Sequence, residues 1–208
     1  MKFTIGSGYE YGKGLVDEIQ GKIEGRMMGS GEDMGLLAQA IEIAGPGDYL
    51  EIGTFFGGSA IVACKAKEKL NKPGKVVCID PYNESYPWRK DGKSNAVADK
   101  KTFWRNMARF GCMCELWPVD SMVADWRRLA DDYNIVVVYV DGDHDIPYVV
   151  NDLWASIRLR PPFIVVDDYS PAHPGIMREV QKVRVQTDYE LVKVGGKTAV
   201  LRDSKWKT

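Results

Sequence analysis

The sequence contains little cysteine and histidine, with four and two residues of these types among 208. Cys112 and Cys114 lie one residue apart, a spacing that suits neither the common zinc motifs nor an easily formed disulfide. The composition therefore supplies poor material for a zinc cluster or a disulfide framework. We expect reduced cysteines, as in a cytoplasmic protein.

The sequence also lacks an excess of positive charge and any long apolar run. Lys and Arg number 28 against 29 Asp and Glu, and the formal net charge is -1. A general binder of nucleic acid normally carries a strong basic excess, so no nucleic-acid partner is expected. No apolar run approaches the ~20 residues that a membrane helix needs, and residues 1–6 lack the apolar core of a signal peptide. We expect one cytoplasmic domain over residues 1–208, without a membrane partner.

What the chain does contain is an alternation of short β-branched runs with stretches of helical periodicity. Ile135–Val140 and Phe163–Val166 are apolar on both faces, as central parallel strands covered by helices require. The alternation predicts an α/β fold with a doubly wound, mostly parallel sheet. The expected strands are Tyr49–Gly53, Lys75–Asp80, Glu115–Val119, Ile135–Val140 and Phe163–Asp167. The expected helices between them are Gly58–Leu70, Ala96–Phe110, Ser121–Tyr133 and Pro147–Leu159.

Both ends of the chain are predicted to add elements to this sheet. Within an N-terminal helical segment of residues 1–47, Met34–Ala44 has helical spacing and is followed by a Gly-Pro-Gly sequence that stops it. Near the other end, Tyr189–Val194 and Lys197–Arg202 flank Gly195-Gly196, which predicts an antiparallel β-hairpin.

One long segment has no regular pattern. Pro81–Asn95 carries Tyr82, Tyr86 and Trp88 among charged residues. Loops of this length are usually functional or disordered. The sequence leaves a lid over an active site and a mobile insertion equally open for residues 81–95.

The first expected strand is followed by a glycine-rich turn. It reads Glu51-Ile52-Gly53-Thr54-Phe55-Phe56-Gly57-Gly58-Ser59. Because ligands of an open parallel sheet bind beyond the carboxyl ends of its strands, this turn is a candidate binding site. Glycines let the backbone approach a ligand closely, and Ser59 can donate a hydrogen bond from the helix start. Neither the dinucleotide fingerprint G-x-G-x-x-G nor a Walker lysine is present, and a purely structural turn is the alternative.

Polar residues also end the second and third strands. A carboxylate at Asp80 can accept hydrogen bonds from the two hydroxyls of a ribose, or it can simply begin a turn. Asp120 and Ser121 can bond an adenine amino group, cap the next helix, or do both.

Acidic residues follow the fourth and fifth strands and are expected to share one crevice. Asp141 begins the sequence Asp141-Gly142-Asp143-His144, and Asp167-Asp168 ends the fifth strand. Close like charges repel unless a cation or a proton intervenes, and oxygen ligands suit Mg²⁺, Ca²⁺ or Mn²⁺ rather than zinc. His144 lies within reach of such a site as a general base, with a structural role as the alternative. His173 is not flanked by acids in this way and is expected to be an exposed loop residue. Because it follows the Asp167-Asp168 turn, a place in the lining of the pocket is the alternative.

Together these residues resemble the class I S-adenosylmethionine-dependent methyltransferases, which have a Rossmann-like seven-stranded sheet. The resemblance covers about residues 48–202, and its nearest branch is the metal-dependent small-molecule O-methyltransferases of the catechol and macrocin types. Leu50–Ala60 resembles the catechol-type first motif. The catechol branch has Asp-Asn in place of Asp167-Asp168 and a lysine in place of His144, three residues after Asp141, so this chain is closer to the macrocin type.

The resemblance implies a role for each of these residues. Two glycines and the serine of the first motif would hold the methionine part of the cofactor S-adenosylmethionine. The whole implied cofactor set is Glu51, Gly53, Thr54, Phe55, Gly57, Ser59, Asp80, Asp120, Ser121 and Asp141. Asp141, Asp167 and Asp168 would hold magnesium (Mg²⁺). Asp141 and His144 would be catalytic, with His144 as the base that takes the proton of an acceptor hydroxyl.

The acceptor implied by the resemblance is a small molecule, either a sugar or a catechol-like compound. One alternative is a methyltransferase that acts without metal on a nitrogen, a protein or an RNA. An NAD-dependent oxidoreductase and a non-catalytic cofactor-binding protein are two further alternatives. The missing dinucleotide fingerprint weighs against the former, and the cluster of acids around His144 weighs against the latter. The sequence leaves the acceptor, the metal requirement and a homo-oligomeric state open.

Overall fold

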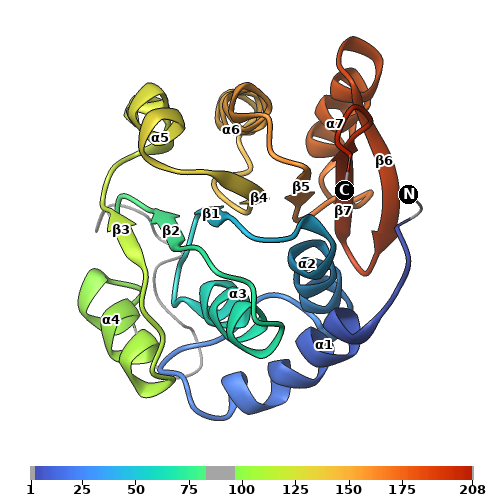
Figure 1. Cartoon of the computed structure of the whole chain (residues 1–208). Coiled ribbons are helices and arrows are strands. Elements are labelled where there is room, and N and C mark those ends of the chain that lie inside the picture. Colours follow the sequence, from blue (N-terminus) through green and yellow to red (C-terminus); the bar gives the residue numbers. More distant parts are fainter. Residues whose placement is uncertain (1–2, 83–96, 208) are drawn as a thin grey trace.

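A mixed sheet with the strand order β3-β2-β1-β4-β5-β7-β6 forms the middle layer of the protein, in a computed structural model that describes residues 3–82 and 97–207 (Figure 1). The first five strands run parallel, and β7 and β6 form an antiparallel hairpin beside β5. The expected fold class is confirmed. The strands are β1 (Asp48–Ile52), β2 (Val76–Ile79), β3 (Glu115–Trp117), β4 (Ile135–Val140), β5 (Phe163–Val166), β6 (Tyr189–Gly195) and β7 (Thr198–Asp203).

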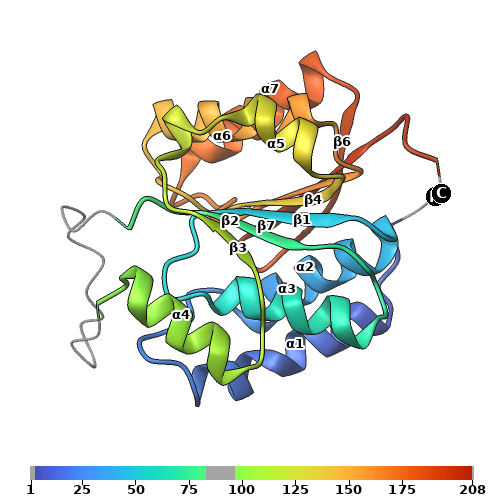
Figure 2. The ribbon, with the colours of Figure 1, turned by 60° about the vertical axis from the view of Figure 1, so that its left-hand side comes forward.

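Helices cover both faces of the sheet. Figure 2 shows α1 to α4 on one face and α5 to α7 on the other. The helices are α1 (Ser7–Gln20), α2 (Gly31–Ala44), α3 (Gly58–Lys69), α4 (Lys100–Arg109), α5 (Trp126–Asp132), α6 (Ile146–Leu159) and α7 (Pro174–Gln186).

The alternation of side chains along the strands divides the hydrophobic core into two clusters. Tyr139 of β4 packs with residues of α1, α2, α3 and α4, whereas its neighbours Val138 and Val140 pack with residues of α6 and α7. Leu50 of β1 pairs with Val138 and lies in the same cluster as Val138. Burial on both faces stabilises the parallel strands and aligns their carboxyl ends at one edge of the sheet.

Two of the expected helices have different bounds because aspartates cap them. The helix expected over Ser121–Tyr133 is a short 3₁₀ turn (Ser121–Val123) followed by α5, since the Asp125 carboxylate accepts the Arg128 N–H and starts a new helix. The helix expected from Ala96 begins at Lys100. There the Asp99 carboxylate accepts the Thr102 N–H at 2.6 Å.

The other elements differ from expectation mainly at their ends. Helix α2 contains the expected Met34–Ala44 and begins three residues earlier, at a capping box between Ser30 and Asp33. The strands β1, β2, β3 and β5 end one or two residues before their expected limits. Helix α7 was not expected, although Ile176, Val180 and Val183 are buried at helical spacing and carried the signal for it.

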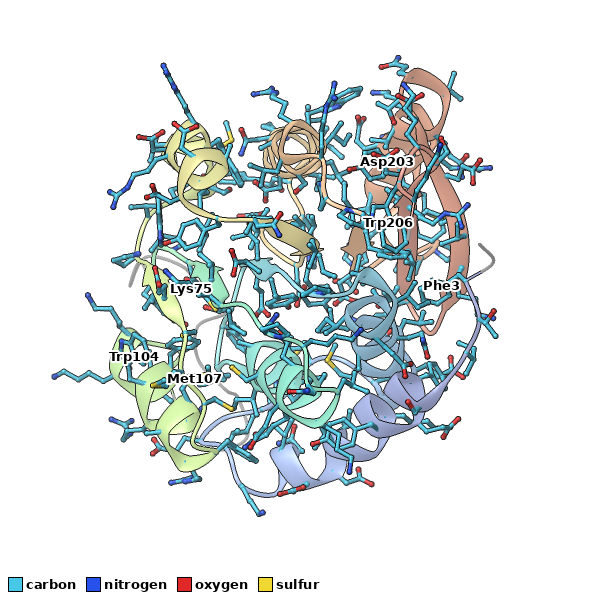
Figure 3. All side chains as sticks on the ribbon, in the orientation of Figure 1. Phe3, Lys75, Trp104, Met107, Asp203 and Trp206 are labelled. Atoms are coloured by element: carbon cyan, nitrogen blue, oxygen red, sulfur yellow. The ribbon has the colours of Figure 1, made fainter. Side chains whose placement is uncertain are left out.

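The two ends of the described chain pack on one side chain at the start of β5. The Phe3 and Trp206 rings lie 6.0 and 5.4 Å from the Phe163 ring, centroid to centroid. Figure 3 shows Phe3 and Trp206 close to each other at this edge of the molecule. Most of the segment expected as a lid, including Tyr86 and Trp88, lies outside the described residues. Within the described ranges, no helix has the length and apolar character needed to cross a membrane.

Candidate active site

The carboxyl ends of the parallel strands enclose a cavity of about 370 Å³. This volume lies in the usual range for small-molecule sites. Among the residues expected from the sequence, the structure brings together around it Gly53, Phe55, Asp80, Asp120, Ser121, Asp141, His144, Asp167 and Asp168. Thr54 and Ser59 instead line a smaller adjoining cavity, and Glu51 and Gly57 line neither of the two.

The glycine-rich turn is held against the ends of two neighbouring strands. Gly53 has a φ of +84°, and a Cβ atom at this position would lie 2.1 Å from the Asp141 carbonyl oxygen. Only glycine permits this approach of β1 to the end of β4. Asp80 fixes the next two residues, because one of its carboxylate oxygens accepts the N–H groups of Thr54 and Phe55 at 3.0 Å each.

Glu51 lies beneath the turn and is fully buried. Its carboxylate accepts hydrogen bonds from the Tyr49 hydroxyl at 2.6 Å and the Ser59 hydroxyl at 2.8 Å. Burial raises the pKa of Glu51 to about 7, although these two hydrogen bonds act in the opposite direction. The Ser59 hydroxyl, at the start of α3, therefore points inward to Glu51. Gly57 forms the N-cap of α3 in a left-handed conformation.

Asp120 and Ser121 lie at the far side of the cavity, after β3. The Asp120 carboxylate accepts the Met122 N–H at 2.8 Å, and its other oxygen accepts the Tyr148 hydroxyl at 3.1 Å. Asn151 of α6 donates to the Ser121 carbonyl. Asp120 thus caps the 3₁₀ turn while facing the cavity, so the capping and binding interpretations are compatible.

Three acidic residues and a lysine meet beyond β4 and β5. Burial raises the pKa of Asp141 well above its usual range, and the charge of Asp167 raises it further. Lys197, at the tip of the β6–β7 hairpin, lies 2.6 Å from an Asp168 oxygen and 3.5 Å from an Asp167 oxygen. Burial lowers the pKa of Lys197, but its hydrogen bond to Asp168 and the nearby carboxylates raise it overall, so it remains an ammonium. The Thr198 hydroxyl oxygen lies 3.1 Å from the other oxygen of Asp167.

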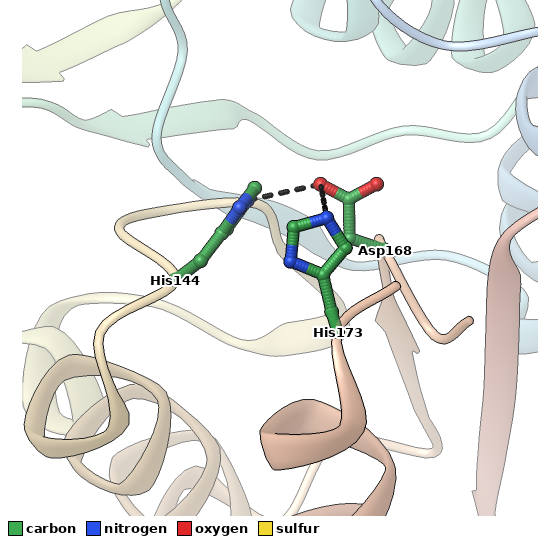
Figure 4. Close-up of side chains that lie close together, drawn as sticks. All are labelled: His144, Asp168 and His173. Carbon is green, nitrogen blue, oxygen red and sulfur yellow. Dashed lines mark ion pairs between the residues drawn. The ribbon is translucent and has the colours of Figure 1, made fainter. Parts of the chain in front are cut away.

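Both histidines of the chain face Asp168 (Figure 4). The Nε2 atom of His144 lies 3.0 Å from an Asp168 oxygen, and the Nε2 atom of His173 lies 3.8 Å from the same oxygen. The two imidazole rings are 4.7 Å apart in an edge-to-face arrangement. His173 is partly exposed and is not among the residues that line the cavity, so it lies beside Asp168 without bordering the cavity itself. Asp168 itself has a φ of +51°, an uncommon conformation that clusters at functional sites.

Sequence reasoning missed Arg26 and Lys197, which both line the cavity. The hairpin tip reaches the cavity because the N-terminal turn of α2 holds it. Glu32 accepts the Gly196 N–H at 2.7 Å, and Asp33 accepts the Lys197 N–H at 2.9 Å. These contacts join residues 164 positions apart, and no local pattern signals them.

A sequence profile described as a methyltransferase domain matches residues 50–169, which run from within β1 through β5 and the acidic cluster. The chain belongs to this methyltransferase family. The methyltransferase has the fold of the class I methyltransferases, which use S-adenosylmethionine as the methyl donor. No curated protein sequence matches it.

Solved structures of O-methyltransferases share the fold of this methyltransferase at low identity. An O-methyltransferase from Bacillus cereus in complex with S-adenosylhomocysteine (SAH) is 14% identical, with a TM-score of 0.61 over 91% of this chain and 90% of that chain. CalS11, a TDP-rhamnose 3'-O-methyltransferase of calicheamicin biosynthesis, is 17% identical, with a TM-score of 0.56 over 80% and 76%. TomG from Streptomyces achromogenes, which is involved in tomaymycin synthesis, is 17% identical, with a TM-score of 0.52 over 81% and 78%.

Proposed function

We propose that this methyltransferase transfers the methyl group of S-adenosylmethionine to a hydroxyl oxygen of a small molecule, a sugar or a catechol-like compound. The observation that carries the proposal is the convergence of His144 with Asp141, Asp167 and Asp168 on one cavity at the strand ends. A base beside a group of carboxylates is suited to removing the proton of a neutral hydroxyl.

His144 is proposed as the base because of its exposure and its partner. Its side chain is 41% exposed, and its Nε2 atom lies 3.0 Å from Asp168. In the tautomer that carries its proton on Nε2, this N–H donates a hydrogen bond to Asp168. The Nδ1 atom is then the basic nitrogen that takes the proton of the acceptor. Asp168 then orients the ring and stabilises the imidazolium that forms.

When bound, S-adenosylmethionine supplies an electrophilic methyl group. The chain's own task is to align the acceptor oxygen with that group. The cofactor is proposed to contact the glycine-rich turn, Asp80 and the Asp120-Ser121 pair. A 370 Å³ cavity that these three segments border supports this arrangement.

The acidic cluster is proposed to hold a divalent cation, and ligand atoms of His144, Asp168 and His173 lie within 4.8 Å of one another at its edge. Burial, and after it the charge of Asp167, raises the pKa of Asp141, and a bound cation would act in the opposite direction. Its donors are carboxylate oxygens, the ligands that magnesium prefers. Asp141, Asp167 and Asp168 would hold Mg²⁺, which supplies Lewis acidity that lowers the pKa of a hydroxyl.

The Lys197 contacts favour a second candidate, which is transfer without a metal. The Lys197 ammonium already lies within 3.5 Å of both Asp167 and Asp168. In this candidate the lysine alone provides the positive charge beside the acceptor, which could then be a nitrogen as well as an oxygen.

We further propose that the methyltransferase is one cytoplasmic domain whose acceptor is not a nucleic acid. The near-neutral net charge of -1 and the acids around the cavity support a small-molecule acceptor. Residues 81–95 are proposed to contribute to acceptor choice, because Pro81 borders the cavity at the start of this segment.

The proposal is tested by incubating the protein with methyl-labelled S-adenosylmethionine and a panel of catechols and nucleotide sugars. We expect O-methyl products by mass spectrometry. We expect the His144→Asn variant to lower kcat about 10²- to 10⁴-fold without changing the Kd for SAH. The exposed Asp131→Asn serves as a control. Products methylated only on nitrogen, or undiminished turnover in His144→Asn, would contradict the respective claim.

A chelation experiment separates the two candidates for the source of positive charge. Activity that is lost after exhaustive chelation and restored by Mg²⁺ supports the metal. Activity that survives chelation but is lost in Lys197→Met supports the lysine.

A further inference from the structure

All four cysteines of the chain meet in one part of the hydrophobic core. Cys78 of β2 and Cys112 are buried in the cluster that also contains residues of α3 and α4, and Cys64 of α3 and Cys114 pack against it. Each of them carries a free thiol. Cys64 and Cys112 come from elements that are far apart in the chain, so the cysteine spacing did not predict their proximity.

The backbone of Cys112 is fixed by the end of α4. Gly111 has a φ of +63°, and the Cys112 N–H donates to the Met107 carbonyl oxygen at 2.9 Å. A left-handed glycine of this kind is typical of a helix end and turns the chain back against the helix. Cys112 is 8% exposed, so it lies near the surface, within reach of a small molecule.

The Cys64 thiol approaches the same segment from α3. Its Sγ atom lies 3.4 Å from the carbonyl oxygen of Met113, the residue after Cys112. The Cys64 and Cys112 thiols hydrogen-bond to each other, and this contact lowers the pKa of Cys112 while it raises the pKa of Cys64. Burial opposes the change in the pKa of Cys112, and the charge of Lys65 adds to it. Cys112 is therefore the thiol that ionises more readily, and Cys64 keeps its proton beside it.

The other two cysteines are poorly placed for a bond to each other. Cys78 pairs with Leu116 in the parallel register, so Cys114 lies two residues back along the neighbouring strand. Strand spacing and rise put the Cα atoms of such a diagonal pair about 8 Å apart, beyond the ~7 Å that a disulfide spans. Cys78 is also fully buried, and burial raises the pKa of its thiol well above the usual range.

We propose that Cys64 and Cys112 form a site of reversible oxidation, at which a hydroperoxide converts the two thiols into a disulfide. The Cys112 thiolate attacks one peroxide oxygen, the O–O bond breaks, and Cys112 becomes a sulfenic acid while the other oxygen leaves as hydroxide or alkoxide. The Cys64 sulfur then attacks the sulfenic sulfur. The S–S bond forms, the S–O bond breaks, and the hydroxyl leaves with the Cys64 proton as water. The two sulfurs lose two electrons to the peroxide, and an external thiol returns them by exchange.

This site lies apart from the cavity and needs neither cofactor nor acceptor. The experiment adds hydrogen peroxide to the reduced protein, alkylates the remaining thiols with iodoacetamide, and measures the intact mass and the tryptic peptides. The proteins compared are the wild type, Cys64→Ser, Cys112→Ser and the control Cys114→Ser, which removes a thiol close to the pair. Melting temperatures under reducing conditions check that each variant folds.

We expect the wild type and Cys114→Ser to lose two alkylated thiols and to yield peptides linked through Cys64 and Cys112, with full recovery after dithiothreitol. Cys64→Ser should stop at a sulfenic acid on Cys112, which dimedone traps, and Cys112→Ser should form no disulfide. The oxidised wild type should melt about 5–10 °C higher than the reduced protein, because the bond constrains the unfolded chain. Unchanged thiols, a link through Cys78 or Cys114, or a link between two chains would overturn the site. None of these results depends on methyl transfer, so failure of the proposed function would be seen separately.

Discussion

At the scale of single residues, the candidate site depends on one close backbone approach. Gly53 follows β1 with a positive φ and leaves space for the carbonyl group of Asp141 only because it has no Cβ atom. Asp141 borders both cavities, so this approach fixes the point at which the two cavities adjoin. A methyl group here would displace the end of β4.

We expect Gly53→Ala to lower the free energy of unfolding by at least about 1–3 kcal/mol and to weaken SAH binding. Urea denaturation and calorimetry measure the two effects. The matched control is Gly14→Ala in α1, where a Cβ atom would meet nothing within 4 Å. There alanine is expected to be neutral or to stabilise the helix by about 0.5–1 kcal/mol. Equal stability of the two variants would contradict the role given to Gly53.

At the scale of elements, the site is completed by a contact between the first turn of α2 and the β6–β7 hairpin. Asp33 is fully buried and accepts hydrogen bonds from the Lys197 N–H and the Thr198 hydroxyl, at 2.9 Å each. Its other oxygen accepts the N–H and the hydroxyl of Ser30 in the capping box. One carboxylate therefore caps a helix and holds the lysine that faces Asp167 and Asp168.

We expect Asp33→Asn to lower the free energy of unfolding by about 1–3 kcal/mol, because an amide cannot accept all of these hydrogen bonds. Hydrogen exchange should become faster at the amide of Lys197 and stay unchanged in the β1–β4 pair. Glu10→Gln, an exposed acid in the first turn of α1, is the control. Unchanged exchange at Lys197 would show that the hairpin tip is held by other contacts.

The same elements show which parts could be predicted from the sequence. The strands and the acids at their ends follow from local periodicity and from the rule that parallel strands end at one edge, so Asp80, Asp120, Asp141 and Asp167 were found. Arg26 and Lys197 were not predicted, because hydrogen bonds to residues far away in the sequence hold them at the cavity. Asn106 holds the segment of Arg26 across 82 positions, and Asp33 holds Lys197 across 164.

At the scale of the whole molecule, stability depends on pH because the carboxyl group of Glu51 is buried beneath the glycine-rich turn. Burial raises the pKa of Glu51 from 4.5 to about 7. The folded state therefore binds a proton more tightly than the unfolded state. Binding of this proton adds to the free energy of unfolding. The addition is complete below pH ~4.5, where Glu51 is protonated in both states, and it is lost as the pH rises through 7.

We expect Glu51→Gln, which has no charge to bury, to remove this part of the pH dependence. Relative to the wild type, the variant should gain stability progressively between pH ~4.5 and ~7, and by about 3 kcal/mol above that range. Urea denaturation at pH 5 and pH 8 measures the difference. The control is Glu190→Gln, at an exposed position. This variant should change the free energy of unfolding by the same amount at pH 5 and at pH 8. A constant difference between Glu51→Gln and the wild type would contradict the raised pKa.

The two ends of the described chain meet on Phe163, at the start of β5 and therefore at the edge of the sheet opposite the cavity. A tag, a surface tether or a fusion partner attached at either end would therefore lie at the edge of the sheet opposite the cavity. The same proximity makes the protein a suitable subject for circular permutation, in which a short linker joins the ends and new termini open in a surface loop.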